Sequence, residues 1–272
     1  MTVDMTFPLA FEWTTHGFEP IQPVTQPTLI VADSWRVMDG TTWGLQDHLA
    51  RFMAAIAAQH TTADPLPNPD FTALQEGLET HLLNIAQRYP QIDFFPRLSV
   101  ERIDVQYRVV LLVRPAPTVR DTTTLLMPNF TDPRSRPTVK GPDIGLLRGL
   151  VAEASTDDVV LHDGTNVIET TTGALLVWRT PQDLVLCQST QQLASISAHR
   201  IVHHARSHDI SVTSRPVTIQ DLVSGEYPVW CTNTLHGISP VTTINDGNTA
   251  TLLPSHPQTA AWQAAWWRRF VS

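Results

Sequence analysis

The spacing of apolar residues along the first half of the chain restricts the folds that it can adopt. Residues 45–59 have apolar side chains every three or four positions, and residues 71–88 repeat this spacing, which predicts two amphipathic helices. Strands are predicted around them, from short apolar runs at residues 29–32, 35–40, 98–105 and 109–113. Helices combined with strands in this way predict an α/β class of fold.

The second half of the chain mixes shorter elements. Strands are predicted at residues 159–162, 166–169, 174–178, 184–187, 210–214 and 229–232, and helices at residues 144–154, 195–207 and 259–270. A stretch rich in proline and threonine, residues 115–121, separates the two halves. We therefore expect a small N-terminal α/β domain, residues 1–116, and a larger C-terminal domain, residues 117–272.

Charge and composition exclude several classes of function. The net charge is −8 and the basic residues are scattered, which argues against a nucleic-acid partner. No apolar run approaches the about 18 residues of a membrane span, and residues 1–8 lack the basic start of a secretory signal. The two cysteines and eleven histidines show no disulfide or metal-site spacing. We expect a soluble protein of the reducing cytoplasm that holds no metal.

Lysine usage points to one residue. The chain has 17 arginines and a single lysine, Lys140. A codon bias explains the replacement of lysine where only positive charge is needed. It leaves open why Lys140 is retained, since arginine cannot supply an amine that forms an imine with a carbonyl.

Lys140 lies among five short segments whose order along the chain is informative. They are His48-Leu49-Ala50-Arg51, then Pro137-Thr138-Val139-Lys140-Gly141, then Asp163-Gly164 followed by Val167-Ile168-Glu169, then Leu193-Ala194-Ser195-Ile196-Ser197, and last Asn233-Thr234 followed by Pro240-Val241. Together they resemble the class IV aminotransferases, which are fold-type IV pyridoxal-phosphate enzymes. This family includes branched-chain and D-amino-acid aminotransferases and 4-amino-4-deoxychorismate lyases.

The resemblance implies a role for each segment. Lys140 would carry pyridoxal phosphate as a Schiff base and move protons, and Arg51 would grip the phosphate in a bidentate contact. Glu169 would pair with the pyridinium nitrogen, which keeps the ring an effective electron sink. The phosphate site would be completed by a helix start and a hydroxyl, from Ser195, Ile196, Ser197 and Thr234. Without the resemblance, Arg51 is an exposed helix residue, Lys140 a loop lysine and Glu169 a strand end.

Some residues depart from the family pattern. Ser195 stands in place of the usual glycine and Ser197 in place of threonine, and the tyrosine that follows the lysine in branched-chain enzymes is missing. Trp35 lies in a segment that lines the substrate pocket in many members, so we expect it to contact substrate. Arg97 is a candidate for binding the substrate carboxylate, with an ordinary salt bridge at a strand edge as the alternative.

The resemblance also implies an architecture and a choice of reactions. We expect a barrel-like sheet in the larger domain, the cofactor between the domains, and a homodimer. The enzyme would transaminate an amino acid, or eliminate pyruvate from 4-amino-4-deoxychorismate. A relative that has lost turnover and only binds the cofactor is the competing hypothesis.

Overall fold

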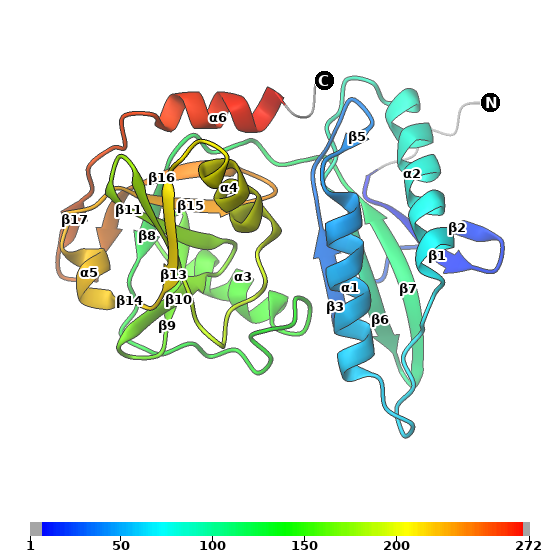
Figure 1. Ribbon diagram of the computed structural model, residues 1–272. Coiled ribbons are helices and arrows are strands. Elements are labelled where there is room, and N and C mark those ends of the chain that lie inside the picture. Colours follow the sequence, from blue (N-terminus) through cyan, green and yellow to red (C-terminus); the bar gives the residue numbers. More distant parts are fainter. Residues whose placement is uncertain (1–6, 269–272) are drawn as a thin grey trace. The chain divides into compact units, whose positions relative to one another are not determined.

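The chain forms two compact units in a computed structural model that describes residues 7–268 (Figure 1). The first unit runs to Thr118 and also contains Val139–Pro142, and the second contains Val119–Thr138 and Asp143–Arg268. The sequence prediction placed residues 139–142 in the larger C-terminal domain. They lie instead with the first unit, because the backbone N–H of Ala32 donates to the carbonyl oxygen of Lys140 at 2.6 Å.

The first unit is built on an antiparallel sheet of five strands in the order β2-β1-β7-β6-β3. These strands are β1 Leu9–Thr14, β2 Gly17–Ile21, β3 Thr28–Ser34, β6 Arg97–Ile103 and β7 Gln106–Val113. A separate small hairpin joins β4 (Val37–Met38) to β5 (Thr41–Thr42). Strand β3 is an edge of the five-stranded sheet, so its outer backbone groups can pair with another segment.

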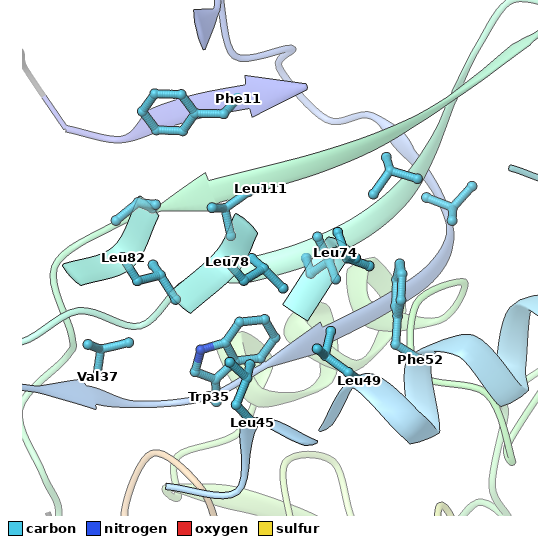
Figure 2. Packing of buried hydrophobic residues seen from close by; sticks show 14 of the residues in the cluster. Phe11, Trp35, Val37, Leu45, Leu49, Phe52, Leu74, Leu78, Leu82 and Leu111 are labelled. Carbon is cyan, nitrogen blue, oxygen red and sulfur yellow. The ribbon is translucent and has the colours of Figure 1, made fainter. Parts of the chain in front are cut away.

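Two helices bury their apolar stripes against this sheet. Helix α1 spans Leu45–Gln59 and helix α2 spans Phe71–Arg88, which confirms both predicted helices. The side chain of Asp70 caps α2 by accepting a hydrogen bond from the N–H of Ala73. Figure 2 shows the resulting core, in which leucines of both helices meet side chains of the sheet. This core gives α1 a fixed place beside β3.

The second unit is dominated by a mixed sheet of ten strands. Nine follow the order β13-β12-β11-β15-β16-β8-β9-β10-β14, and β17 pairs with β16. The bounds are β8 Thr123–Leu126, β9 Asp158–His162, β10 Asn166–Thr170, β11 Ala174–Thr180, β12 Asp183–Cys187, β13 Ser211–Arg215, β14 Val217–Thr218, β15 Val229–Asn233, β16 Gly237–Asn245 and β17 Ala250–Leu252. With the first unit, this sheet confirms the α/β class of fold.

Four helices accompany the large sheet: α3 Ile144–Glu153, α4 Ile196–Arg206, α5 Ile219–Val223 and α6 Thr259–Arg268. The helix predicted at the C-terminal end is α6, and residues 269 and 270 of that prediction lie outside the described residues. Helix α6 buries Trp262 and Trp266. Trp262 packs against Trp178 and Trp230 with ring centroids 5.8 and 5.4 Å apart, which attaches α6 to β11 and β15.

Candidate active site

Lys140 is held against the edge strand of the first unit. Gly141 has a φ of +142°, and a Cβ built on it would lie 2.9 Å from backbone atoms of both Val31 and Ala32. Real Cβ contacts are not that short, so only glycine lets the chain pass this close to β3. The close approach and the hydrogen bond from Ala32 fix the backbone of Lys140, whose Nζ lies 3.8 Å from Oδ1 of Asp33.

Asp33 is the centre of a charged cluster in the first unit. Its carboxylate accepts hydrogen bonds from Nε and Nη2 of Arg51 at 2.8 and 2.7 Å and contacts Nδ1 of His48 at 2.9 Å. The residue has no exposed surface. Burial alone would raise the pKa of Asp33, but Arg51, His48 and Lys140 together hold this pKa well below its usual value. Asp33 is therefore an anion that orients Arg51 and attracts the ammonium of Lys140.

Helix α1 supplies two of the basic partners of Asp33, His48 and Arg51. His48 and Arg51 are three residues apart, so they share the face of α1 that meets β3. His48 is buried, and burial lowers its pKa, although the Asp33 carboxylate opposes this shift. Nε2 of His48 has no hydrogen-bond partner within the described part of the chain. Arg51 thus lies where the sequence predicts it, on α1, and the structure brings it together with Lys140 through Asp33.

Glu169 lies in the second unit, near the end of β10, and is 5% exposed. Glu169 is therefore not a strand end that faces solvent, and its charge has partners. Nη1 of Arg134 donates to its Oε1 at 2.6 Å, and the backbone N–H of Leu193 donates to the same atom at 3.0 Å. Burial raises the pKa of Glu169, and Arg134 opposes this effect. Both hydrogen bonds use Oε1, so Oε2 is the oxygen left for a further partner.

Arg134 was not a candidate in the sequence analysis. Besides Glu169 it binds Asp132, at 2.7 Å between Nη2 and Oδ2, and the carbonyl oxygens of Pro137 and Gln191. Arg134 is separated from Glu169 by 35 positions along the chain. No local pattern marks such a pair, because only the fold brings the two side chains together.

The segment that leads into helix α4 is hydrogen-bonded to Glu169 and Arg134. Leu193 and Gln191, which bind Glu169 and Arg134, belong to the segment that leads into α4. The hydroxyl of Ser195 accepts a hydrogen bond from the N–H of Ala198 at 3.2 Å and so caps the helix. Ile196 and Ser197 form its first turn, and Ser197 is buried. The fourth segment thus forms the helix start expected of an anion site.

Thr234 lies in the tight turn between β15 and β16. Oδ1 of Asn233 accepts hydrogen bonds from the N–H groups of Leu235 and His236 at 3.0 and 2.7 Å. Nδ2 of Asn233 donates to the hydroxyl of Thr172 at 3.3 Å. Since Thr172 follows β10, the second unit connects the turn at Thr234 to the strand that carries Glu169.

The two candidate substrate residues have strong structural partners. Nη2 of Arg97 donates to Oε1 of Glu101 at 3.0 Å, so the structure contains the salt bridge that was the alternative interpretation of Arg97. The indole of Trp35 is 1% exposed and lies among the leucines of the first core (Figure 2). This position in the core does not support the expected contact of Trp35 with substrate. Packing in the core explains why an apolar residue follows β3.

Two further features of the described residues bear on the type of site. Across residues 7–268, no group of three or more histidine, cysteine or acidic side chains is arranged to hold a metal ion. Among the helices of the same residues, none has both the length and the apolar character needed to cross a membrane.

Comparisons with known proteins show which folds and which family this chain is similar to. The fold resembles a fold IV-transaminase from Curtobacterium pusillum, with 16% identity, a TM-score of 0.78 and 97% of each chain covered. It also resembles the pyridoxal-phosphate-bound form of an aminotransferase from Mycobacterium tuberculosis, described as hypothetical, with 14% identity, a TM-score of 0.79, and 97% of this chain and 99% of that chain covered.

A third similar structure is from Legionella pneumophila and is assigned as a 4-amino-4-deoxychorismate lyase. Its identity is 16% and its TM-score 0.70, over 92% of this chain and 96% of that chain. No curated protein matches the chain. Residues 31–244 match the sequence model of the family described as amino-transferase class IV. This match spans more than half of the chain, and the chain therefore belongs to the class IV aminotransferase family.

Proposed function

We propose that this chain is a pyridoxal-phosphate-dependent enzyme that binds its cofactor covalently through Lys140. The observation that carries the proposal is the way Lys140 is held. Gly141 lets the backbone of Lys140, the only lysine of the chain, lie close against β3. The Nζ of Lys140 lies 3.8 Å from the Asp33 carboxylate, which orients Arg51. Membership of the class IV family and the pyridoxal-phosphate-bound neighbour support the same cofactor.

The residues proposed to hold the phosphate fit that group chemically. Nε and Nη2 of Arg51 both donate to Asp33, which fixes the orientation of the guanidinium. A guanidinium is suited to bidentate phosphate contacts. Ser195, Ile196 and Ser197 start helix α4, whose first N–H groups and positive dipole end favour an anion. The hydroxyl of Thr234 lies in a turn that Asn233 holds in shape.

Glu169 fits the ring nitrogen. It is a buried carboxylate with Oε1 engaged by Arg134 and Leu193, and its Oε2 is suited to accept a hydrogen bond from a pyridinium N–H. When bound, pyridoxal phosphate supplies an aldehyde that condenses with amines and a ring that accepts electrons. Glu169 would keep that ring nitrogen protonated. The Nζ atom of Lys140 would accept a proton from the substrate carbon and later donate it back.

Two reactions use these residues in the same way. In transamination of an amino acid, Lys140 would return the proton, an oxo acid would leave, and the amino group would be retained for transfer to a second oxo acid. In the lyase reaction, the same amine would assist elimination of pyruvate from 4-amino-4-deoxychorismate. The structures of both kinds of protein among the similar folds support testing the two substrates side by side.

The assembly and compartment are part of the proposal. We propose a homodimer, because helix α3 is rich in leucine yet has no buried residue, with Leu146 42% exposed. We also propose the cytoplasm, where the thiols of Cys187 and Cys231, both free here, stay reduced. Sedimentation of the purified protein tests the first point, and a tagged protein followed in its host tests the second.

The function is tested by adding pyridoxal phosphate to the purified protein and measuring its visible absorbance. We expect a coloured protein with one bound cofactor per chain. An amino acid should bleach this band with release of an oxo acid, or 4-amino-4-deoxychorismate should yield pyruvate. Colour without any product would favour the competing hypothesis of a cofactor-binding relative. A protein that takes up no cofactor would contradict the proposal.

The single lysine allows a matched control. Arg148 is exposed on α3, eight residues from Lys140. The double variant Lys140→Arg with Arg148→Lys keeps one lysine and the net charge but moves the amine. We expect it to remain folded and colourless, whereas Arg148→Ala alone should bind cofactor as the wild-type protein does.

A further inference from the structure

A buried carboxylate that is not among the proposed cofactor-binding residues accepts hydrogen bonds from the turn that follows Glu169. This is Asp158, the first residue of β9, which has no exposed surface. Three consecutive threonine hydroxyls donate to it: Thr170 to Oδ2 at 2.9 Å, Thr171 to Oδ1, and Thr172 to Oδ2. Because Glu169 directly precedes these threonines, Asp158 fixes the backbone at the end of β10, immediately after Glu169.

The hydrogen bonds of this turn leave it little freedom. The N–H of Val159 also donates to Asp158, at 2.8 Å, so the carboxylate is satisfied by four neutral donors. The N–H of Thr171 donates to the carbonyl oxygen of Val159, and that of Thr170 to the carbonyl oxygen of Gly173. A buried carboxylate loses its hydration, so each of these donors is needed to stabilise it. Movement of the turn would break several of them at once.

The same turn is also hydrogen-bonded to the segment that contains Thr234, a residue proposed to bind the phosphate. Thr172 accepts a hydrogen bond from Nδ2 of Asn233, and Oδ1 of Asn233 holds the N–H groups that follow Thr234. Gly173 packs so closely on β15 that a Cβ there would lie 2.6 Å from the carbonyl oxygen of Thr232. A continuous chain of contacts therefore runs from Asp158 through Thr172 and Asn233 to the turn of Thr234.

We propose that Asp158 is a positioning residue, which sets the place of Glu169 and Thr234 together without touching the cofactor. The inference rests on the proposed function, because it gives these two residues their roles at the ring nitrogen and the phosphate. The hydrogen bond between Asn233 and Thr172 links the turn after Glu169 to the turn that contains Thr234. The link means that a change at Asp158 alters two separated contacts with one ligand.

The test compares Asp158→Asn with a matched turn elsewhere in the second unit. Asp246 also holds a turn, accepting the N–H groups of Asn248 and Thr249 and the hydroxyl of Thr249, but at the tip of the β16–β17 hairpin. We expect Asp158→Asn to weaken binding of pyridoxal phosphate about tenfold, as when groups behind direct ligands are removed. Asp246→Asn should bind it as the wild-type protein does.

Two readouts separate positioning from a purely structural role. The pH titration of the visible band should shift in Asp158→Asn, since Glu169 would no longer hold the ring nitrogen in place. Amide hydrogen exchange at residues 233–236 should speed up as well, while both stay unchanged in Asp246→Asn. A lowered melting temperature alone, with wild-type affinity and titration, would overturn the inference.

Thr172→Val keeps the test decisive if Asp158→Asn fails to fold. Thr172 is exposed, so the fold should tolerate its replacement, yet the link between Asp158 and Asn233 is lost. We expect weaker cofactor binding here too, and wild-type affinity would overturn the inference. A wild-type protein that binds no pyridoxal phosphate would overturn the proposed function and this inference together. A wild-type protein that binds it, with variants that bind equally well, would overturn this inference alone.

Discussion

Replacing Gly141 by alanine should detach Lys140 from β3 without unfolding the protein. The glycine has a φ of +142°, and an added Cβ would lie 2.9 Å from backbone atoms of Val31 and Ala32. If residues 139–142 kept their place, the unusual φ would cost about 1–3 kcal/mol and the overlap about 1–3 kcal/mol more.

Release of the segment costs less than this strain. It loses the hydrogen bond between Ala32 and Lys140, worth about 1 kcal/mol. It also loses the contact between Lys140 and Asp33, worth about 0–1 kcal/mol because the lysine is partly exposed. The smaller cost decides the outcome. We expect the free energy of unfolding to fall by only about 1–2 kcal/mol, while Lys140 is displaced and the protein stays colourless.

The assay pairs urea unfolding, followed by tryptophan fluorescence, with titration of pyridoxal phosphate followed by visible absorbance. Gly149→Ala is the matched control, since Gly149 lies inside α3 and an added Cβ would meet no atom within 4 Å. That variant should bind cofactor normally and gain about 0.5–1 kcal/mol of stability. A Gly141→Ala protein that takes up cofactor with wild-type affinity would refute this account of how Lys140 is held.

Two further predictions concern charge. Asp33→Asn should lower the free energy of unfolding by about 3–5 kcal/mol at neutral pH, because it leaves Arg51 without its buried anion. The lowered pKa of Asp33 means that its contribution is present above about pH 4 and is lost in stronger acid, so urea unfolding should show the two proteins converging there, and parallel curves would contradict this. Burial lowers the pKa values of His48, His81 and His256, so the unfolded chain binds protons more readily below about pH 6.5. The urea midpoint should therefore fall from pH 8 to pH 5.5, and an equal or higher midpoint at pH 5.5 would show that these histidines are not buried in neutral form.

The sequence predicts the elements whose residues face one core. Helices α1 and α2 have the predicted bounds because their leucine stripes face a single apolar layer. The hairpin of β1 and β2 was not predicted, since Pro20 lies within β2 and β1 pairs with β7, which is far away along the chain. Strand β16 was missed for a similar reason, because it contains Pro240.

The candidate site shows the same division. Arg51 and Glu169 lie on the elements predicted for them, since each belongs to a recognisable apolar pattern, and Lys140 precedes the predicted helix α3. Their partners could not be predicted. Asp33 is 18 positions from Arg51, and Arg134 is 35 positions from Glu169, so these contacts depend on strand order and not on local spacing. The roles of the site residues toward a cofactor stay predictions.

The central claim is that Lys140 carries the cofactor, and borohydride reduction followed by mass spectrometry tests it most directly. Lys140 is the only lysine, so the single other primary amine is the one at the N-terminus. We predict that the reduced protein gains the mass of one reduced cofactor and that peptide mapping places it on Lys140. Lys140→Arg should gain nothing. A label confined to the N-terminal amine, or equal labelling of Lys140→Arg, would contradict the claim.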